Sequence, residues 1–142
     1  MREKILFVYE SDGEYKIEGI WAKKGKDFYK VDNIPFYIKN IAIGDIVSVE
    51  KDKDELFFNE IVKTSGHSTI QIVFFEYKEK NRVLTELENF GCHWEESDNR
   101  NLVSIDIAPN INYKAIIQYL EKEVSITNLD YREACIGKKT YN

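Results

Sequence analysis

The chain has 142 residues, of which 43% are hydrophobic and 13% aromatic, and this fits one compact domain or two small packed units with a real core. Its 25 acidic and 20 basic residues give a net charge of −5. This sign argues against binding to the phosphates of nucleic acids and favours encounter with a basic partner.

The N-terminus has a short apolar run that is followed at once by acidic residues, without a small-residue cleavage site, so we expect no secretory signal. No apolar run approaches the ~20 residues that a membrane-spanning helix needs. Cys92 and Cys135 are too few for a disulfide framework and are expected to be reduced, partly buried thiols. These features predict a cytoplasmic protein without a membrane partner.

The first half of the chain reads as a series of short strands, in which β-favouring apolar residues alternate with turn signals such as "SDGE" and "KKGK". We expect these strands at residues 4–10, 15–22, 27–32, 46–51 and 56–64. Five short strands joined mostly by tight turns predict a small, curled, barrel-like sheet.

The stretch "VDNIPFYIKNIAIGDIV" interrupts this series at residues 31–47. Pro35 has no N–H and restricts the residue before it, so residues 33–43 are expected to leave the sheet and cross over it, pinned by their apolar side chains. Gly44 and Asp45 then make a turn that starts the next strand. We expect the Asp45 carboxylate to accept backbone N–H groups and lock this turn.

The second half has a different rhythm, in which strands alternate with helical periodicity. Asn81 and Asn112 are expected to cap the two helices, and Gly91 to end the first one. The expected strands lie at 69–77, 92–97, 102–108 and 129–136, and the expected helices at 80–91 and 112–123. This order predicts a ferredoxin-like βαββαβ unit with both helices on one face of the sheet.

The sequence therefore predicts an α+β fold with two subdomains. Residues 1–66 would form the β-rich, barrel-like subdomain, and residues 67–142 the ferredoxin-like subdomain. The small polar segment "SGHS", at residues 65–68, marks the boundary between them.

Three motifs resemble a known family when they are taken together. The strings "DNIPFYIKNIAIGDIV", "SGHSTI" and "FGC" occur here in the order typical of an uncharacterised bacterial family, domain of unknown function 4265. The resemblance extends from about Trp21 to about Ala134. It implies a small bacterial cytoplasmic protein, and some similar proteins look like neutralisers encoded beside secreted toxins. It implies no functional residue.

Catalytic and cofactor sites are not expected. His67 lies in one loop with Ser65 and Ser68, but residues so close in sequence rarely form a nucleophile–base pair, and no nucleophile elbow is present. We expect Gly66 to adopt a positive φ and the His67 ring to cap a backbone carbonyl. Cys and His pairs with zinc spacing and a Gly-rich phosphate loop are both missing, so no metal or cofactor is predicted.

Cys92 and His93 are also weak candidates for a nucleophile and its base, because neighbours in a strand point to opposite faces. RNA binding would need aromatic residues on the strand at 102–108, which has none and carries Asp106 instead. The carboxylates of "WEES" and "DKDE" are expected to be solvated at turns rather than paired across a cleft.

Three functions follow as hypotheses. The favoured one is a non-enzymatic protein-binding module, such as an immunity protein that neutralises a basic toxin by occlusion, with acidic rim residues and aromatic anchors. The alternatives are a small-ligand sensor and a hydrolase-like enzyme that uses His67. The predicted rim residues are Asp52, Asp54, Glu55, Glu95, Glu96 and Asp98, and the predicted anchors are Tyr77 and Trp94.

Overall fold

The computed structural model describes residues 1–137 and shows a mixed α+β protein with two β-sheets. The first sheet is a closed barrel of five strands in the order β1-β2-β3-β4-β5. Its strands are β1 (Arg2–Ser11), β2 (Glu14–Lys24), β3 (Tyr29–Val31), β4 (Ile46–Asp52) and β5 (Glu55–Lys63). The predicted barrel-like sheet is thus confirmed.

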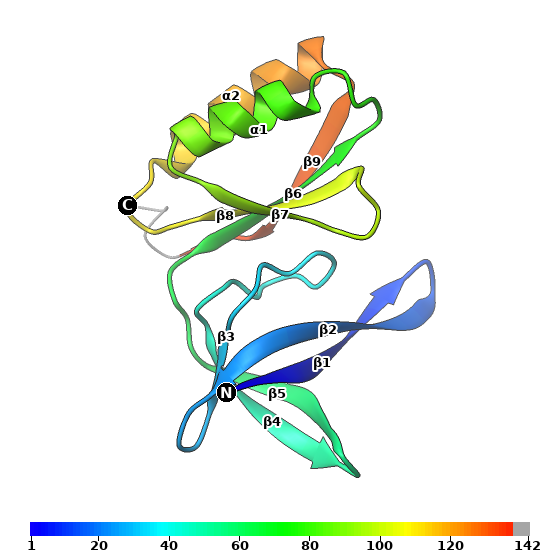
Figure 1. Cartoon of the computed structure of the whole chain (residues 1–142), viewed down its shortest axis with the longest axis vertical. Helices are drawn as coiled ribbons and strands as arrows, with labels where there is room; N and C mark the ends of the chain where they lie inside the picture. The colour runs from blue at the N-terminus through cyan, green and yellow to red at the C-terminus, as the bar shows by residue number, and fades with distance from the viewer. Residues whose placement is uncertain (138–142) are drawn as a thin grey trace.

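The barrel is closed by a short parallel pairing between β1 and β5, which joins Ile5 to Leu56 and Leu6 to Phe57. Beyond this pairing, β1 and β2 continue as a two-stranded hairpin that projects from the barrel (Figure 1). The hairpin turns at Asp12 and Gly13, which both have a positive φ, as a two-residue hairpin loop requires.

The second sheet has four strands in the order β7-β8-β6-β9, and each neighbouring pair is antiparallel. Helices α1 and α2 lie side by side on the face that points away from the barrel (Figure 1). These elements are β6 (Ser68–Phe74), α1 (Lys80–Asn89), β7 (His93–Glu96), β8 (Leu102–Ile107), α2 (Tyr113–Ile126) and β9 (Leu129–Cys135). None of the helices in residues 1–137 is long and apolar enough to cross a membrane.

Several predicted element ends were wrong: the second helix, for example, continues to Ile126 rather than ending at residue 123. The sixth strand ends at Phe74 rather than at residue 77, because the neighbouring strands begin opposite Val73 and Phe74 and offer no partner beyond them. Asn81 does not cap α1, which begins one residue earlier, after Glu79, without a side-chain cap. By contrast, the Asn112 side chain accepts a hydrogen bond from the N–H of Ala115 at 3.2 Å, as expected for a cap.

Each sheet has its own buried core. The barrel core is built from residues such as Ile5, Phe7 and Ile20, and the second core lies between the sheet and the two helices. Between β3 and β4 runs the connecting segment, residues 32–45, which contains no helix or strand. It lies between the barrel and the helix-free face of the second sheet (Figure 1), so the predicted departure of residues 33–43 from the sheet is confirmed.

Candidate functional site

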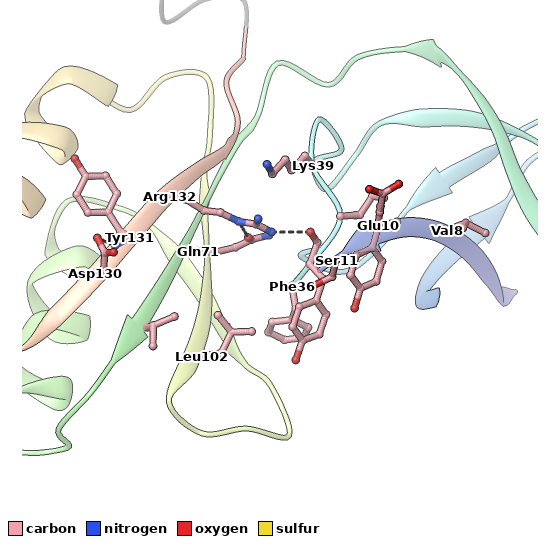
Figure 2. Close-up of a pocket in the computed structure, with 14 residues that line it drawn as sticks. Val8, Glu10, Ser11, Phe36, Lys39, Gln71, Leu102, Asp130, Tyr131 and Arg132 are labelled. Carbon is pink, nitrogen blue, oxygen red and sulfur yellow. Dashed lines mark hydrogen bonds between the residues drawn. The ribbon is translucent and has the colours of Figure 1, made fainter. Parts of the chain in front are cut away.

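A cleft of about 620 Å³ lies where the hairpin, the connecting segment and the second sheet meet. We call it the interunit cleft. Its walls are residues 8–11 of β1, residues 36–39 of the connecting segment, and side chains of β6, β8 and β9 (Figure 2). The cleft thus draws on five segments of the chain that are far apart in sequence.

Arg132 is the main polar group of this cleft. Its guanidinium donates one hydrogen bond from Nε to Oε1 of Gln71 and another from Nη2 to the carbonyl oxygen of Tyr37, at 2.6 Å (Figure 2). Both acceptors are neutral. Within residues 1–137, no carboxylate forms an ion pair with Arg132. The cleft therefore holds a positioned cation that no carboxylate of residues 1–137 approaches within ion-pair distance.

Gln71 adds an unsatisfied donor beside this cation. The residue is only 3% exposed, and its amide nitrogen Nε2 is buried without a hydrogen-bond partner. Its oxygen is already committed to Arg132. A buried donor without an acceptor is costly, so this amide nitrogen is a polar group beside Arg132 whose hydrogen bond is still unmade.

Two stacked tyrosines give the cleft an aromatic wall. The rings of Tyr9 and Tyr37 are nearly parallel, with centroids 5.8 Å apart. Burial raises the pKa of Tyr9, and the nearby Tyr37 and Glu18 raise it further, while Arg132 opposes the change. The Tyr9 hydroxyl therefore stays protonated and able to donate at neutral pH.

Glu18 explains why the connecting segment holds its shape at the cleft. This buried carboxylate accepts three backbone N–H groups, from Phe36 at 2.7 Å and from Tyr37 and Ile38 at 2.9 Å each. Glu18 lies on β2, opposite Phe7 of β1. Sequence alternation placed Glu18 on a face of its strand but gave no signal for this role.

The predicted partner-binding residues do not form one continuous rim. Asp52, Asp54 and Glu55 lie at the turn between β4 and β5, on the barrel, whereas the remaining ones belong to the second unit. In Figure 1 the hairpin of β4 and β5 and the hairpin of β7 and β8 lie on different units. Tyr77 is 59% exposed and Asp98 is exposed, so both are free to contact another protein.

Glu95, Glu96 and Trp94 are partly committed to contacts within the chain. Glu95 accepts the backbone N–H of Ile34 at 3.0 Å, so it helps to hold the connecting segment against the second sheet. Glu96 forms an ion pair with Lys80. The indole N–H of Trp94 donates to Glu88 at 2.9 Å, and its ring packs against the second core.

The His67 loop is built differently from our expectation. Gly66 has φ of +87°, as predicted, but the His67 ring does not cap a carbonyl: its Nδ1 lies 2.8 Å from Oδ1 of Asp106. Strand β8 places Asp106 on the face that meets this loop, so the His67 ring pairs with a carboxylate instead of a carbonyl. Asp106 is largely buried, and burial raises the pKa of its carboxyl while His67 opposes the change.

Asp45, His67 and Cys135 line one small cavity of about 150 Å³ at the junction of the two units. Asp45 is engaged there as predicted, because it accepts the N–H groups of Ala42 at 3.0 Å and Ser65 at 2.8 Å. Burial, followed by the charge of Asp45, raises the pKa of the Cys135 thiol to about 11. The thiol is therefore protonated at neutral pH and is a poor nucleophile.

Cys92 behaves as a buried core residue. It is 3% exposed, and burial together with Asp106 raises the pKa of its thiol to about 12. His93 follows it at the start of β7 and is exposed. The two side chains thus have different environments, in agreement with the prediction from strand alternation.

A closed barrel joined to a helix-covered sheet, with a cleft between them, defines an α+β protein of two packed units. The family model described as Domain of unknown function (DUF4265) matches residues 18–128, and the chain belongs to this family. The resemblance of the three motifs is thereby confirmed.

One similar solved structure is described as a novel crystal structure of a hypothetical protein from Neisseria gonorrhoeae. It matches this chain with a TM-score of 0.87 and 27% sequence identity over 96% of both chains. No curated protein matches the chain in sequence.

Proposed function

We propose that the protein is a non-enzymatic binding module that acts by occluding a protein partner, in the manner of an immunity protein that neutralises a basic toxin. The observation that carries this proposal is an exposed apolar surface on the projecting hairpin of β1 and β2. We call it the hairpin face and define it as Val8, Tyr15 and Ile17.

The hairpin face is made by strand register. Val8 lies opposite Ile17, and Tyr15 is two residues before Ile17 on the same side of β2. Val8 is 52% exposed, Ile17 56% and Tyr15 79%. Exposed apolar side chains that cluster on one face support a protein contact more strongly than single ones do.

Charge on the hairpin supports a basic partner. Glu10, Asp12 and Glu14 are exposed at the hairpin tip, and Lys16 is the basic residue closest to them along the hairpin. An acidic rim beside an apolar centre would steer a basic surface onto the hairpin. The acidic residues predicted at the turn between β4 and β5 would extend the negative field without touching this centre.

A co-expression experiment tests the proposal. The probe is the C-terminal domain of a secreted toxin encoded beside this protein, and the readout is growth of the producing cells. The wild-type chain should restore growth. Ile17→Asp should lose this protection, with affinity reduced at least ~10-fold, because a charge replaces an apolar contact at the centre of the interface.

Val62→Asp is the matched control, because Val62 is an exposed valine on β5, outside the hairpin face. It should protect as well as the wild type. Circular dichroism must show that both variants are folded. A toxin that stays fully active beside the wild-type chain would refute the proposed function, and full protection by Ile17→Asp would refute the hairpin face.

The ferredoxin-like architecture of the second unit and the cytoplasmic location of the protein are also part of this proposal. The element order βαββαβ and the strand order β7-β8-β6-β9 support a ferredoxin-like second unit. The two free thiols support a reducing compartment, so we place the protein in the cytoplasm.

A further inference from the structure

We propose that the interunit cleft binds a small organic monocarboxylate, with the carboxylate at Arg132 and an apolar or aromatic body against Tyr9 and Tyr37. This site shares Val8 with the hairpin face, but its polar groups are different and it does not depend on the proposed function. It gives the protein a ligand-binding activity at the junction of its two units.

The proposed position of the ligand carboxylate follows from the hydrogen bonds of Arg132. Two neutral oxygens hold the guanidinium in place, on Gln71 and on the main chain of Tyr37. Nε–H and one N–H of Nη2 are used in these contacts, which leaves the second N–H of Nη2 and both N–H groups of Nη1 to meet a ligand. A guanidinium fixed in this way loses little freedom when it binds and matches the planar geometry of a carboxylate.

Gln71 supplies the second reason for an anionic oxygen. Its unpartnered Nε2 is bonded to the same carbon as the oxygen that holds Arg132, so the free donor lies beside the guanidinium. Nε2 is covered in this structure, so a ligand oxygen at the base of the cleft reaches this donor only when the Gln71 side chain shifts. A ligand without an acceptor at this point would leave the buried donor unpaired, which is costly.

The other lining residues define the rest of the ligand. The stacked rings of Tyr9 and Tyr37 offer an aromatic wall, and Phe36 and Val8 extend it with apolar surface. A volume of about 620 Å³ lies within the range of small-molecule sites, roughly 300–1,000 Å³. An apolar or aromatic body of modest size fits these walls.

The other charged side chains of the cleft favour a ligand with one carboxylate. Lys39 lines the cleft as a second cation, while Glu10 and Asp130 line it as anions. The two carboxylates would repel a second negative charge. The site therefore favours a monocarboxylate or a zwitterion over a dicarboxylate.

The test is a titration of the full chain followed by ¹H–¹⁵N correlation spectra. The probes are 4-hydroxyphenylacetate, indole-3-acetate and octanoate, each compared with its uncharged amide. At least one acid should give saturable shifts at Ser11, Lys39 and Arg132. Its amide should bind at least ~10-fold more weakly, because it lacks the charge that Arg132 recognises.

Arg132→Gln should weaken the acid at least ~10-fold, whereas Lys114→Gln should not change its binding. Lys114 is the matched control, because it is an exposed cation on α2, on the far side of the second sheet. The acid–amide comparison uses the wild-type chain, so the proposal remains testable if Arg132→Gln does not fold.

Three outcomes would overturn the proposal: no saturable shifts with any of the three acids, equal affinity for an acid and its amide, or full affinity in a folded Arg132→Gln variant. A fourth probe, acetyl-Gly-Gly-Tyr with a free C-terminal carboxylate, separates a small molecule from a chain end. Binding of this peptide alone would overturn the assignment to small carboxylates.

Discussion

Two buried carboxylates hold the connecting segment in place. Glu18 accepts three backbone N–H groups in the middle of the segment, and Asp45 accepts one, from Ala42, near its end. An irregular segment has backbone donors that no sheet or helix satisfies, and these two residues supply the missing acceptors. Asp45 also reaches Ser65, so one side chain fixes both the end of the connecting segment and the link to the second unit.

At the residue scale we predict that Asp45→Asn lowers the free energy of unfolding by about 1–3 kcal/mol. The amide keeps one acceptor but places its NH₂ group against a backbone N–H, in a site that is 2% exposed. Urea unfolding measures this change. Asp52→Asn, at an exposed turn, serves as the control and should stay within about 0.5 kcal/mol of the wild type. An equally small effect at Asp45 would contradict the role of this carboxylate.

At the scale of elements, the two helices are joined by one buried acid. Glu123 of α2 receives two hydrogen bonds from the guanidinium of Arg82 on α1, at 3.0 and 2.8 Å, and a third from Thr127 at 2.6 Å. Chiefly because of Arg82, the pKa of Glu123 falls from 4.5 to about 2. This contact aligns the start of α1 with the end of α2.

We predict that Glu123→Gln lowers the free energy of unfolding at pH 7 by about 1–2 kcal/mol, less than the full pKa shift implies because Arg82 is about half exposed. The folded-state pKa is depressed, so the stabilisation is complete above pH 4.5 and is lost as the pH falls toward about 2. The difference between wild type and variant should therefore vanish at acid pH.

Unfolding curves measured from pH 7 to pH 2 check this dependence. Glu79→Gln is the matched control, because it removes a partly exposed acid that also contacts Arg82. It should change stability by less than about 0.5 kcal/mol at every pH. A gap between wild type and Glu123→Gln that stays constant with pH would rule out the ion pair as its cause.

At the scale of the whole molecule, the connecting segment joins two separate cores. It is fixed to the barrel by Glu18 and to the second sheet by five hydrogen bonds. In three of these, Ile34 donates to Glu95, Ser104 donates to the carbonyl of Pro35, and Arg132 donates to that of Tyr37. The same segment forms a wall of the interunit cleft, so the cleft exists only when both units are folded and docked.

We predict that the two units unfold together in the wild type and separately in Glu18→Gln. Trp21 lies in the barrel and Trp94 in the second sheet, so Trp94→Phe and Trp21→Phe leave one fluorescent reporter in each unit. The two urea transitions should coincide in the wild type. In Glu18→Gln the barrel reporter should unfold first, because the connecting segment loses acceptors there.

Glu14→Gln is the control on the same strand, and its two transitions should coincide as in the wild type. Glu14 is exposed near the hairpin tip, away from the connecting segment. Separate transitions in the wild type itself would show that the docking contacts do not couple the units.

The sequence by itself determined the secondary structure and its order, because those signals are local. Asp12 and Gly13 can both adopt the backbone of a tight hairpin, Gly91 takes the positive φ that ends α1, and Pro35 prevents strand pairing. Asp45 was predictable for the same reason, since the carboxylate accepts a donor only three residues away. Two of the family motifs, "DNIPFYIKNIAIGDIV" and "FGC", contain Pro35, Asp45 and Gly91.

Only the tertiary structure decided the interunit cleft. Tyr9, Tyr37, Gln71 and Arg132 belong to four distant segments, and nothing in their own neighbourhoods marks them. Alternation along a strand shows that a residue faces one side of a sheet, but not what covers that side. Here the connecting segment covers the helix-free face. Gln71 and Arg132 therefore line one cleft only because of long-range packing, which local sequence patterns do not reveal.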